Sequence, residues 1–232
     1  MTRYILASRT VWPIDEFLRR RSELSGEWLL MTSETDLTTD VLQRFDPRYV
    51  FFPHWSSIVP RAILDAHECV CFHMTDVPFG RGGSPLQNLV SRGIKETKLS
   101  ALRMTEQLDA GPVYAKHPLD LSGSADEIFR RAATISLDIM AWMIAHEPSP
   151  VQQTGEPTFF PRRKPDQSAI PMSGSLESLY NHIRMLDAEG YPHAFADIGD
   201  WRAEFTGASL EGDTVTAKVK LLNNLKKGYE AG

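Results

Sequence analysis

Cysteines are few in this sequence, and long apolar runs are missing. Only Cys69 and Cys71 occur among 232 residues, so the fold cannot depend on disulfides, and a reducing cytoplasm is the expected location. No apolar run approaches the roughly 18 residues of a membrane-spanning helix. Residues 1–7 turn polar too soon for a signal peptide. These absences predict a cytoplasmic protein with no membrane partner.

Glycine spacing typical of nucleotide cofactors is also missing. Residues 8–10, after the first predicted strand, lack the dinucleotide-binding pattern, and Gly80-Arg81-Gly82-Gly83 lacks the lysine of a Walker loop. Cofactor binding in the manner of dehydrogenases or kinases is therefore disfavoured. The net charge of −5 argues against bulk attraction to nucleic acid, although residues 162–164 form a local basic cluster.

The first half of the sequence alternates short apolar segments with amphipathic ones. Strands are expected at 4–7, 28–31, 49–52 and 69–72, with helices starting at Pro13 and Pro60 and spanning 38–45. This alternation predicts an α/β fold. We expect a Rossmann-like, mostly parallel twisted sheet with helices on both faces.

The second half of the sequence indicates further elements and a change of composition. Strands are expected at 97–104 and 112–115, and a helix at 124–146 begins with a capping-box-like Ser124-Ala125-Asp126-Glu127. Prolines crowd 148–167, and after them a helix at 176–186 and strands at 201–205 and 214–219 are expected. We therefore predict a first domain at 1–147, a linker packed on it at 148–175 and a small C-terminal β-rich α+β extension at 176–232. The tail 222–232 is expected to fray.

Two residues are candidates for catalysis. His73 follows the fourth predicted strand, and ligands of parallel sheets bind at the carboxyl ends of the strands. Asp109 lies in the tight turn Leu108-Asp109-Ala110-Gly111 between two predicted strands. Each has a structural alternative, since a single histidine is often only packed, and aspartate commonly caps its own turn.

A metal site is not expected in this region. His67, Cys69, Cys71 and His73 alternate, so they share one face of a strand and resemble zinc ligands by type. However, six strand residues span about 20 Å. Ligands must lie about 2.0–2.3 Å from one zinc ion. One buried strand with a functional histidine at its end is the better interpretation.

Two motifs together resemble those of a known family. Residues 73–87 read His-Met-Thr-Asp-Val-Pro-Phe-Gly-Arg-Gly-Gly-Ser-Pro-Leu-Gln, which is similar to the His-Pro-Ser-Leu-Leu-Pro…Arg-Gly-x-x-Pro-x-Gln signature of folate-dependent formyltransferases. Leu108-Asp109-Ala110-Gly111 matches the Leu-Asp-x-Gly motif of the same family, at the family's usual interval from the histidine. The order and spacing make the pair more specific than either motif alone.

The resemblance continues more weakly beyond residue 120. Residues 155–159, 162–165 and 180–186 look like segments of small bacterial amino-sugar N-formyltransferases of the pseudaminic-acid type. The resemblance implies an enzyme that uses N10-formyl-tetrahydrofolate as donor cosubstrate. The implied acceptor is a small molecule, the primary amine of a nucleotide-linked amino sugar, rather than a nucleic acid. A homodimer is compatible with the resemblance.

One position departs from the family pattern. The asparagine that usually lies two positions before the histidine is replaced here by Cys71, and a thiol cannot donate the strong amide hydrogen bond that holds a developing oxyanion. His54, after the third predicted strand, is the best substitute, and Thr75 is a weaker one. The alternative for His54 is a packed ring beside Trp55.

The resemblance also implies roles for individual residues. His73 would take the proton of the attacking amine, and Asp109 would orient its ring. The folate is expected against Trp55, Ser56, Ile58, Glu106, Gln107 and Asp109. The acceptor is expected against Arg81, Gly82, Gln87, Arg163 and Arg184, although solvent-exposed arginines are an equally good interpretation of the basic cluster.

Three other functions remain compatible with the sequence. A hydrolase would release formate from the folate with water in place of the amine. A non-catalytic folate-binding module would explain the cysteine at position 71. Among transferases, an amino acid or a hydroxylamine is an alternative acceptor, whereas transfer RNA is disfavoured by the acidic charge and the short extension.

Overall fold

The computed structural model describes residues 1–224, which form two compact units. The first unit contains Met1–Pro85, Thr97–Leu119 and Phe129–Phe160, and the second contains Leu86–Glu96, Asp120–Ile128 and the chain from Pro161 onward. The proline-rich segment is therefore divided, with 148–160 in the first unit and 161–175 in the second. The domain boundaries expected at 147 and 175 stay a prediction.

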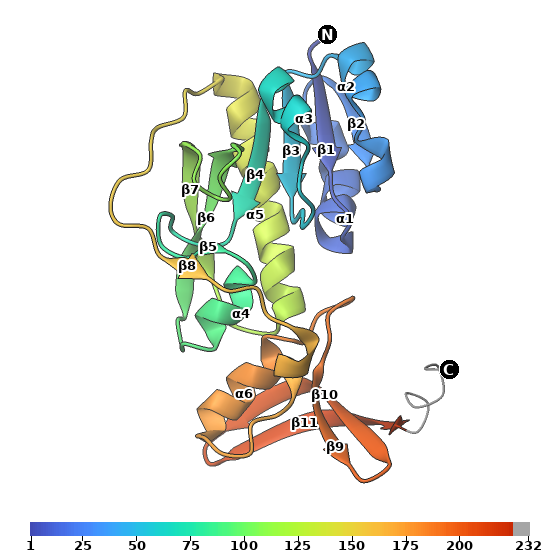
Figure 1. Ribbon diagram of the computed structural model, residues 1–232, viewed down its shortest axis with the longest axis vertical. Helices are drawn as coiled ribbons and strands as arrows, with labels where there is room; N and C mark the ends of the chain where they lie inside the picture. The colour runs from blue at the N-terminus through green and yellow to red at the C-terminus, as the bar shows by residue number, and fades with distance from the viewer. Residues whose placement is uncertain (225–232) are drawn as a thin grey trace. The chain divides into compact units, whose positions relative to one another are not determined.

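A six-stranded sheet forms the centre of the first unit (Figure 1). Its strand order is β2-β1-β3-β4-β6-β7, and β1 to β4 run parallel, whereas β6 is antiparallel to β4. The strands are β1 (Arg3–Ala7), β2 (Glu27–Met31), β3 (Tyr49–Pro53), β4 (Cys69–His73), β6 (Glu96–Arg103) and β7 (Val113–Asp120). The predicted mostly parallel sheet is confirmed.

Helices pack on both faces of this sheet because the strands alternate apolar residues on both sides. On one face, Leu42 of α2 (Thr39–Phe45) and Ile63 of α3 (Arg61–Ala66) join a core cluster with Val50 and Phe52. On the other face, α1 (Val11–Arg20) places Phe17 5.3 Å from the ring of Trp28 on β2. Both faces are thus excluded from water, as a parallel sheet requires.

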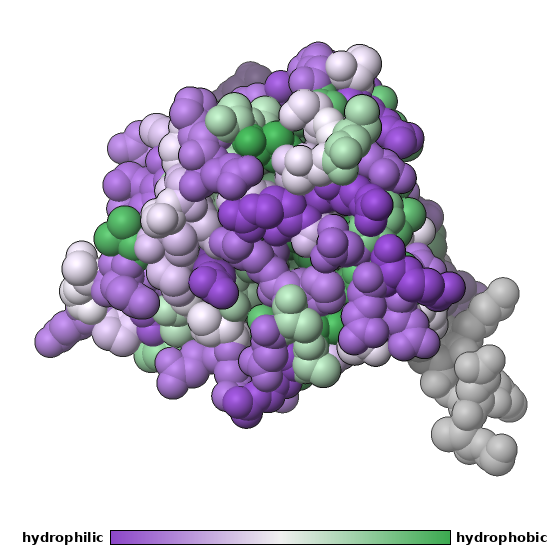
Figure 2. Space-filling model, turned by 90° about the horizontal axis from the view of Figure 1, so that it is seen from above, coloured by the Kyte–Doolittle hydropathy of each residue, from purple (hydrophilic) through white to green (hydrophobic). Residues whose placement is uncertain are grey.

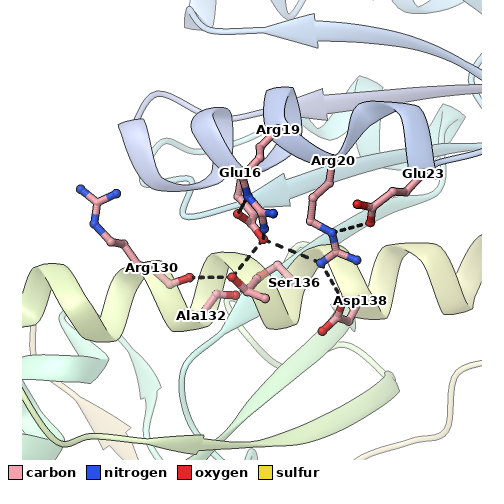
Figure 3. Close-up of polar contacts among 9 residues, drawn as sticks. Glu16, Arg19, Arg20, Glu23, Arg130, Ala132, Ser136 and Asp138 are labelled. Atoms are coloured by element: carbon pink, nitrogen blue, oxygen red, sulfur yellow. Dashed lines mark hydrogen bonds and ion pairs between the residues drawn. The ribbon is translucent and has the colours of Figure 1, made fainter.

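The long helix α5 (Ala125–His146) is joined to α1 by apolar and polar contacts. The rings of Trp12 and Phe129 lie 4.7 Å apart. Arg20 of α1 reaches Asp138 of α5 at 2.8 Å, and the Thr134 hydroxyl donates to Glu16 at 3.0 Å (Figure 3). Exposed ion pairs of this kind contribute little individually, so the aromatic contact is the main stabilising term.

The second unit contains α6 (Leu176–Arg184) and an antiparallel sheet in the order β11-β10-β9. Its strands are β9 (Ala194–Ile198), β10 (Trp201–Glu211) and β11 (Thr214–Asn223), which confirms the predicted C-terminal β-rich extension. The expected fraying at 222–232 was wrong at its start, because Leu222 pairs with Arg202 within the sheet. The rest of that prediction, 225–232, lies outside the described residues.

Some elements are too short to produce a recognisable pattern in the sequence. The two-residue strands β5 (Arg81–Gly82) and β8 (Phe159–Phe160) pair in parallel and were not predicted. The helix α4 (Pro85–Val90) begins at a proline, a residue that suits the first turn of a helix. Short 3₁₀ turns lie at Arg21–Glu23, Glu34–Asp36 and Pro165–Ser168. Pairing of the proline-rich segment with Arg81–Gly82 is a tertiary feature without a local signal.

The surface is mostly polar on the face that Figure 2 shows, where apolar residues occur in small separate groups. Within residues 1–224, no helix has both the length and the apolar character needed to cross a membrane.

A polar network lies at the amino ends of β3 and β4. Glu68 accepts hydrogen bonds from the Tyr114 hydroxyl and from the Arg48 guanidinium, which also donates to the Tyr49 hydroxyl at 3.0 Å. Burial alone would raise the pKa of Glu68, but the bonds from Tyr114 and Arg48 outweigh it and lower that pKa. The charged form of Glu68 is therefore stabilised by folding.

Replacing Tyr114→Phe should lower the free energy of unfolding by about 1–2 kcal/mol at pH 7, because Glu68 loses a charge-assisted hydrogen bond. A carboxyl with a lowered folded pKa stabilises the protein above its unfolded pKa, and this stability is lost as the pH falls through the folded value. The difference should thus shrink by about pH 3 in urea denaturation. Tyr180→Phe in α6 is the control. An equal difference at both pH values would contradict this account.

Candidate functional site

His73 and Asp109 meet in the first unit. His73 ends β4 and is only 6% exposed, and its Nδ1 lies 3.5 Å from Oδ2 of Asp109. Asp109 follows β6, which pairs with β4 in an antiparallel register that sets His73 opposite Ser100. The pairing of these two strands therefore brings together two residues that are distant in sequence.

The backbone of the 108–111 turn explains its sequence. Asp109 has φ 52°, a left-handed conformation that aspartate tolerates better than most residues. At Gly111, a Cβ atom would lie 1.8 Å from the carbonyl oxygen of Arg103, so only glycine fits there. The turn directs the Asp109 carboxylate inward, where Oδ2 also accepts a hydrogen bond from the Gly82 backbone N–H at 2.9 Å.

The second ring nitrogen of His73 is also in a hydrogen bond. Nε2 lies 2.8 Å from the carbonyl oxygen of Gly80, which can only accept, so Nε2 is the donor. The imidazole is thus placed between a carbonyl and the Asp109 carboxylate, two acceptors. Only the doubly protonated ring can donate to both. Thr75, fully buried, directs its Oγ1 to the same Gly80 oxygen at 3.4 Å.

The loop that carries Gly80 is fixed at several points. Asp76 accepts from Lys98 at 2.9 Å and also from Lys116, whose ammonium group donates to the Val77 carbonyl as well. These two lysines lower the pKa of Asp76 although burial alone would raise it. The Gly80 N–H donates to Oγ1 of Thr158 at 2.7 Å. The Gly80 carbonyl therefore approaches His73 from an ordered loop.

A residue that sequence analysis missed links this loop to the Asp109 turn. The Gln153 amide donates to the carbonyl oxygens of Asp109 at 2.8 Å and Gly111 at 2.7 Å. Its Oε1 accepts from Nε and Nη2 of Arg81 at 3.1 and 2.7 Å. Gln153 lies in the proline-rich segment, where no local pattern distinguishes it from Gln152. The predicted substrate contact of Arg81 stays a prediction, since two of its nitrogens face Gln153.

His54 follows β3, and its ring packs against aromatic side chains. Its φ is 53°, and the ring lies between Trp12 and Phe129, with centroids 5.1 and 4.5 Å away. Its predicted part in holding the oxyanion stays a prediction. Burial lowers the pKa of His54 to about 4, so the ring is neutral near pH 7. The geometry favours a packing role for His54, and we leave it out of the catalytic group.

Cys71 is half-buried, and its thiol stays protonated. Burial raises the pKa of the thiol, and the charge of Asp109 raises it further. Burial also raises the pKa of Cys69 to about 12. Among the described residues, no three His, Cys, Asp or Glu side chains cluster as metal ligands would.

The segments expected to bind the folate carry exposed apolar side chains. Ile58 is 95% exposed, and Leu108, which the sequence analysis did not single out, is 71% exposed. Glu106 contacts Arg61 of α3 at 3.4 Å, which links the 106–109 turn to the segment after β3. Trp55 packs on the core, but its buried Nε1 lacks a hydrogen-bond partner in the described chain. Ser56 and Gln107 are exposed.

The residues expected to bind the acceptor are divided between the two units. Gly82 lies beside Asp109 in the first unit. Gln87, Arg163 and Arg184 belong to the second unit and make internal hydrogen bonds there, with Gln87 donating to the Met185 carbonyl at 3.2 Å. Their predicted role in acceptor binding stays a prediction.

Arg184 has a clear structural role. Its guanidinium donates to the carbonyl oxygens of Leu121 at 2.6 Å and Gly123 at 2.8 Å, and to Oδ1 of Asn181 at 2.8 Å. The buried charge is thereby satisfied by backbone groups of the same unit. Arg184 also lines a cavity of about 370 Å³ in that unit, with Tyr180 as its aromatic wall.

Comparisons with known proteins show which family the chain resembles in sequence and fold. The family described as "Methionyl-tRNA formyltransferase, C-terminal domain" matches residues 165–222. A structure of methionyl-tRNA formyltransferase from Clostridium thermocellum is 42% identical, covers 96% of this chain and 100% of its own, and superposes with a TM-score of 0.93. A sugar N-formyltransferase from Shewanella sp. shares the fold at 13% identity, covering 91% of this chain and 99% of its own, with a TM-score of 0.68.

Curated relatives are longer than this chain. Methionyl-tRNA formyltransferase from Thermodesulfovibrio yellowstonii is 24% identical over 201 residues, which are 82% of this chain and 65% of that protein. The relative from Bacillus subtilis is 29% identical over 161 residues, which are 66% of this chain and 50% of that protein. The chain thus spans about half to two thirds of the length of these relatives.

Both thiols should be unreactive in the native protein. Because the thiolate is the nucleophile, a pKa of about 12 for Cys69 implies a reaction with Ellman's reagent at pH 8 that is roughly a thousandfold slower than that of a free cysteine. Unfolding in guanidinium should release two reactive thiols, and the variant Cys69→Ala should release one. Rapid titration of a thiol in the folded protein would contradict the burial described here.

Proposed function

The chain belongs to the formyltransferase family, and we propose that it transfers a formyl group from N10-formyl-tetrahydrofolate to a primary amine. The observation that supports this activity is the contact between His73 and Asp109, at 3.5 Å, at the carboxyl end of a parallel strand. This contact brings together His73 of the first family motif and Asp109 of the second, and both side chains are largely buried.

The pair suits acyl transfer to an amine. The amine nitrogen attacks the formyl carbon, and the bond from that carbon to N10 of the folate then breaks. The imidazole of His73 takes the proton that the amine loses, and returns one to the departing N10. The Asp109 carboxylate stabilises the imidazolium through Nδ1. Before either step, Nε2 must release the Gly80 carbonyl and give up the proton that it donates there to solvent, so that the neutral ring can accept the proton of the amine.

The donor is proposed to bind along the 55–58 segment and the 106–109 turn. Ile58 and Leu108 present apolar surface suited to a flat heterocycle. The unpartnered Trp55 Nε1 is a buried donor beside this surface, and the satisfaction of such a group by a ligand is worth about 1–3 kcal/mol. Backbone groups of the turn can complete the contacts.

The acceptor has two candidates. A nucleotide-linked amino sugar is favoured by the net charge of −5, which opposes binding to a polyanion. Methionyl-tRNA is favoured by the names of the relatives and by the family that matches residues 165–222. Length does not decide between them, because the Clostridium thermocellum structure is matched over 100% of its own chain. We propose the amino sugar on the argument from charge alone, and the assay below tests both acceptors.

Turnover should depend on both members of the pair. The variants His73→Ala and Asp109→Asn should each reduce turnover by about 10²–10⁴-fold, because the proton acceptor or its orienting charge is lost. The assay incubates N10-formyl-tetrahydrofolate with amino-sugar nucleotides, amino acids, hydroxylamines or methionyl-tRNA, and detects the added formyl group by mass spectrometry.

Circular dichroism of each variant controls for folding. Near-normal turnover in either variant would contradict the proposed mechanism. Formate release from the donor alone would instead indicate a hydrolase, and tight folate binding without turnover would indicate a binding module. Formylation of methionyl-tRNA but of no amino-sugar nucleotide would overturn the proposed acceptor while leaving the reaction unchanged.

A homodimer is supported by one face of the C-terminal sheet. The register sets Trp201 opposite Ile198, and Ala203 and Phe205 opposite Leu221 and Val219, so these apolar residues share a face. Trp201, Ile198, Leu221 and Val219 are 56%, 55%, 62% and 54% exposed. The exposed parts of these four side chains together offer on the order of 400 Å², which is the size of the largest apolar patch on a typical monomer, and such patches are often functional.

A second copy of this chain is the proposed occupant. Two such faces together bury about 800 Å², less than a stable interface, so the expected dimer is weak and depends on concentration. The double variant Trp201→Lys/Leu221→Lys should shift the mass from dimer to monomer in light scattering coupled to gel filtration, since it places charge in the apolar contact. Leu18→Lys on α1, an exposed apolar residue outside this face, is the control. A wild-type protein that is monomeric at high concentration would rule the dimer out.

A further inference from the structure

We propose that Gln153 is a positioning residue of this site, which holds the Asp109 carboxylate against His73. Its kinetic consequences rest on the proposed formyl transfer, whereas its effect on the His73 ring does not. Gln153 touches neither His73 nor the carboxylate in any hydrogen bond that the structure shows. It acts through the backbone of the turn and through Arg81.

The hydrogen bonds of Gln153 use the full capacity of its side chain. The amide group has two N–H donors, which face the carbonyls of Asp109 and Gly111, and an oxygen with two lone pairs, which face Nε and Nη2 of Arg81. All four distances are 3.1 Å or less. A side chain with only a packing role would not need this arrangement on three separate residues.

Gln153 contacts the residues on both sides of the hydrogen bond that orients the Asp109 carboxylate, the bond from the Gly82 N–H to Oδ2. Oδ2 of Asp109 accepts from the N–H of Gly82, and Gln153 binds the carbonyl of Asp109 itself and the side chain of Arg81, the residue before Gly82. Gln153 thus joins the acceptor and the donor of that bond. Movement of either part would change the 3.5 Å separation between the carboxylate and Nδ1 of His73.

The turn needs such support because its conformation is unfavourable. A left-handed φ at a residue other than glycine costs about 1–3 kcal/mol and persists only where the surroundings enforce it. Asp109 has φ 52°, and its carbonyl is one of the two that Gln153 binds. Without the amide donors, the turn can relax toward commoner conformations, and the carboxylate moves with it.

The segment that carries Gln153 is anchored independently of its side chain. Val151 and Val113 exchange two backbone hydrogen bonds of 2.8 Å, and Thr158 donates to the Pro78 carbonyl at 3.1 Å. The side chain can therefore be changed while the backbone stays in place. Substitution at 153 should lower stability modestly rather than prevent folding.

Three variants separate positioning from general support. Gln153→Ala removes all four bonds. Gln153→Glu keeps an acceptor for Arg81 but loses both donors to the turn, so a role through Asp109 predicts the same defect as in Gln153→Ala. Gln152→Ala, at the exposed neighbouring position, is the matched control.

We expect Gln153→Ala and Gln153→Glu to lower kcat by about 10–100-fold, because a displacement near 1 Å at a catalytic group has effects of this size. KM for N10-formyl-tetrahydrofolate should change less than kcat, since Gln153 contacts the 106–109 turn but not the 55–58 segment of the proposed donor site. The pH profile of kcat should change in the same sense as in Asp109→Asn. Gln152→Ala should resemble the wild type in all three measurements.

A second measurement needs no turnover. The imidazole ¹⁵N resonances of His73 at one fixed pH should move in Gln153→Ala toward their positions in Asp109→Asn, and should not move in Gln152→Ala. Unchanged His73 resonances with unchanged kcat in Gln153→Ala would overturn the proposal. Moved resonances in a protein that formylates no amine would reject the proposed function and support the positioning role.

Discussion

The contact between the Asp109 carboxylate and the His73 imidazole constrains the chain segments that surround it. Burying a charge is costly unless hydrogen bonds and a partner replace the lost water. For Asp109, the Gly82 N–H and the His73 ring supply that replacement, and both come from chain segments distant from the 108–111 turn. The sheet that carries His73 and the loop that carries Gly82 must therefore both be in place before the pair exists.

Glycine positions show how tightly this region is built. At Gly82, a Cβ would lie 2.5 Å from the Phe160 carbonyl, and at Gly80 it would lie 2.6 Å from the Phe160 ring. Both clashes involve Phe160 of β8, which pairs beside β5. The glycine-rich sequence that resembles a phosphate-binding loop is thus explained here by close packing against another segment. The same approach brings the Gly80 carbonyl to His73.

Much of the fold was predictable because it follows from local patterns. Apolar segments that alternate with amphipathic ones determined the parallel sheet, and the motif pair located His73 and Asp109. Gln153 was not predictable, since its partners are backbone carbonyls and Arg81, and nothing in the sequence near 153 reveals them. The packing of the His54 ring between Trp12 and Phe129 was not predictable either, because it depends on a left-handed φ of 53° and on two residues distant in sequence.

The cysteine at position 71 changes how the oxyanion can be held. Burial and the charge of Asp109 keep the Cys71 thiol neutral, so it places no negative charge beside the forming oxyanion. The S–H group is, however, only a weak hydrogen-bond donor. The positive charge that stabilises the oxyanion must then come from His73. Its ring lies between two hydrogen-bond acceptors, and only the imidazolium form can donate to both. One of these acceptors, the Gly80 carbonyl, occupies the nitrogen that the reaction needs. Substrate binding and the opening of that single hydrogen bond are therefore linked events in the proposed mechanism.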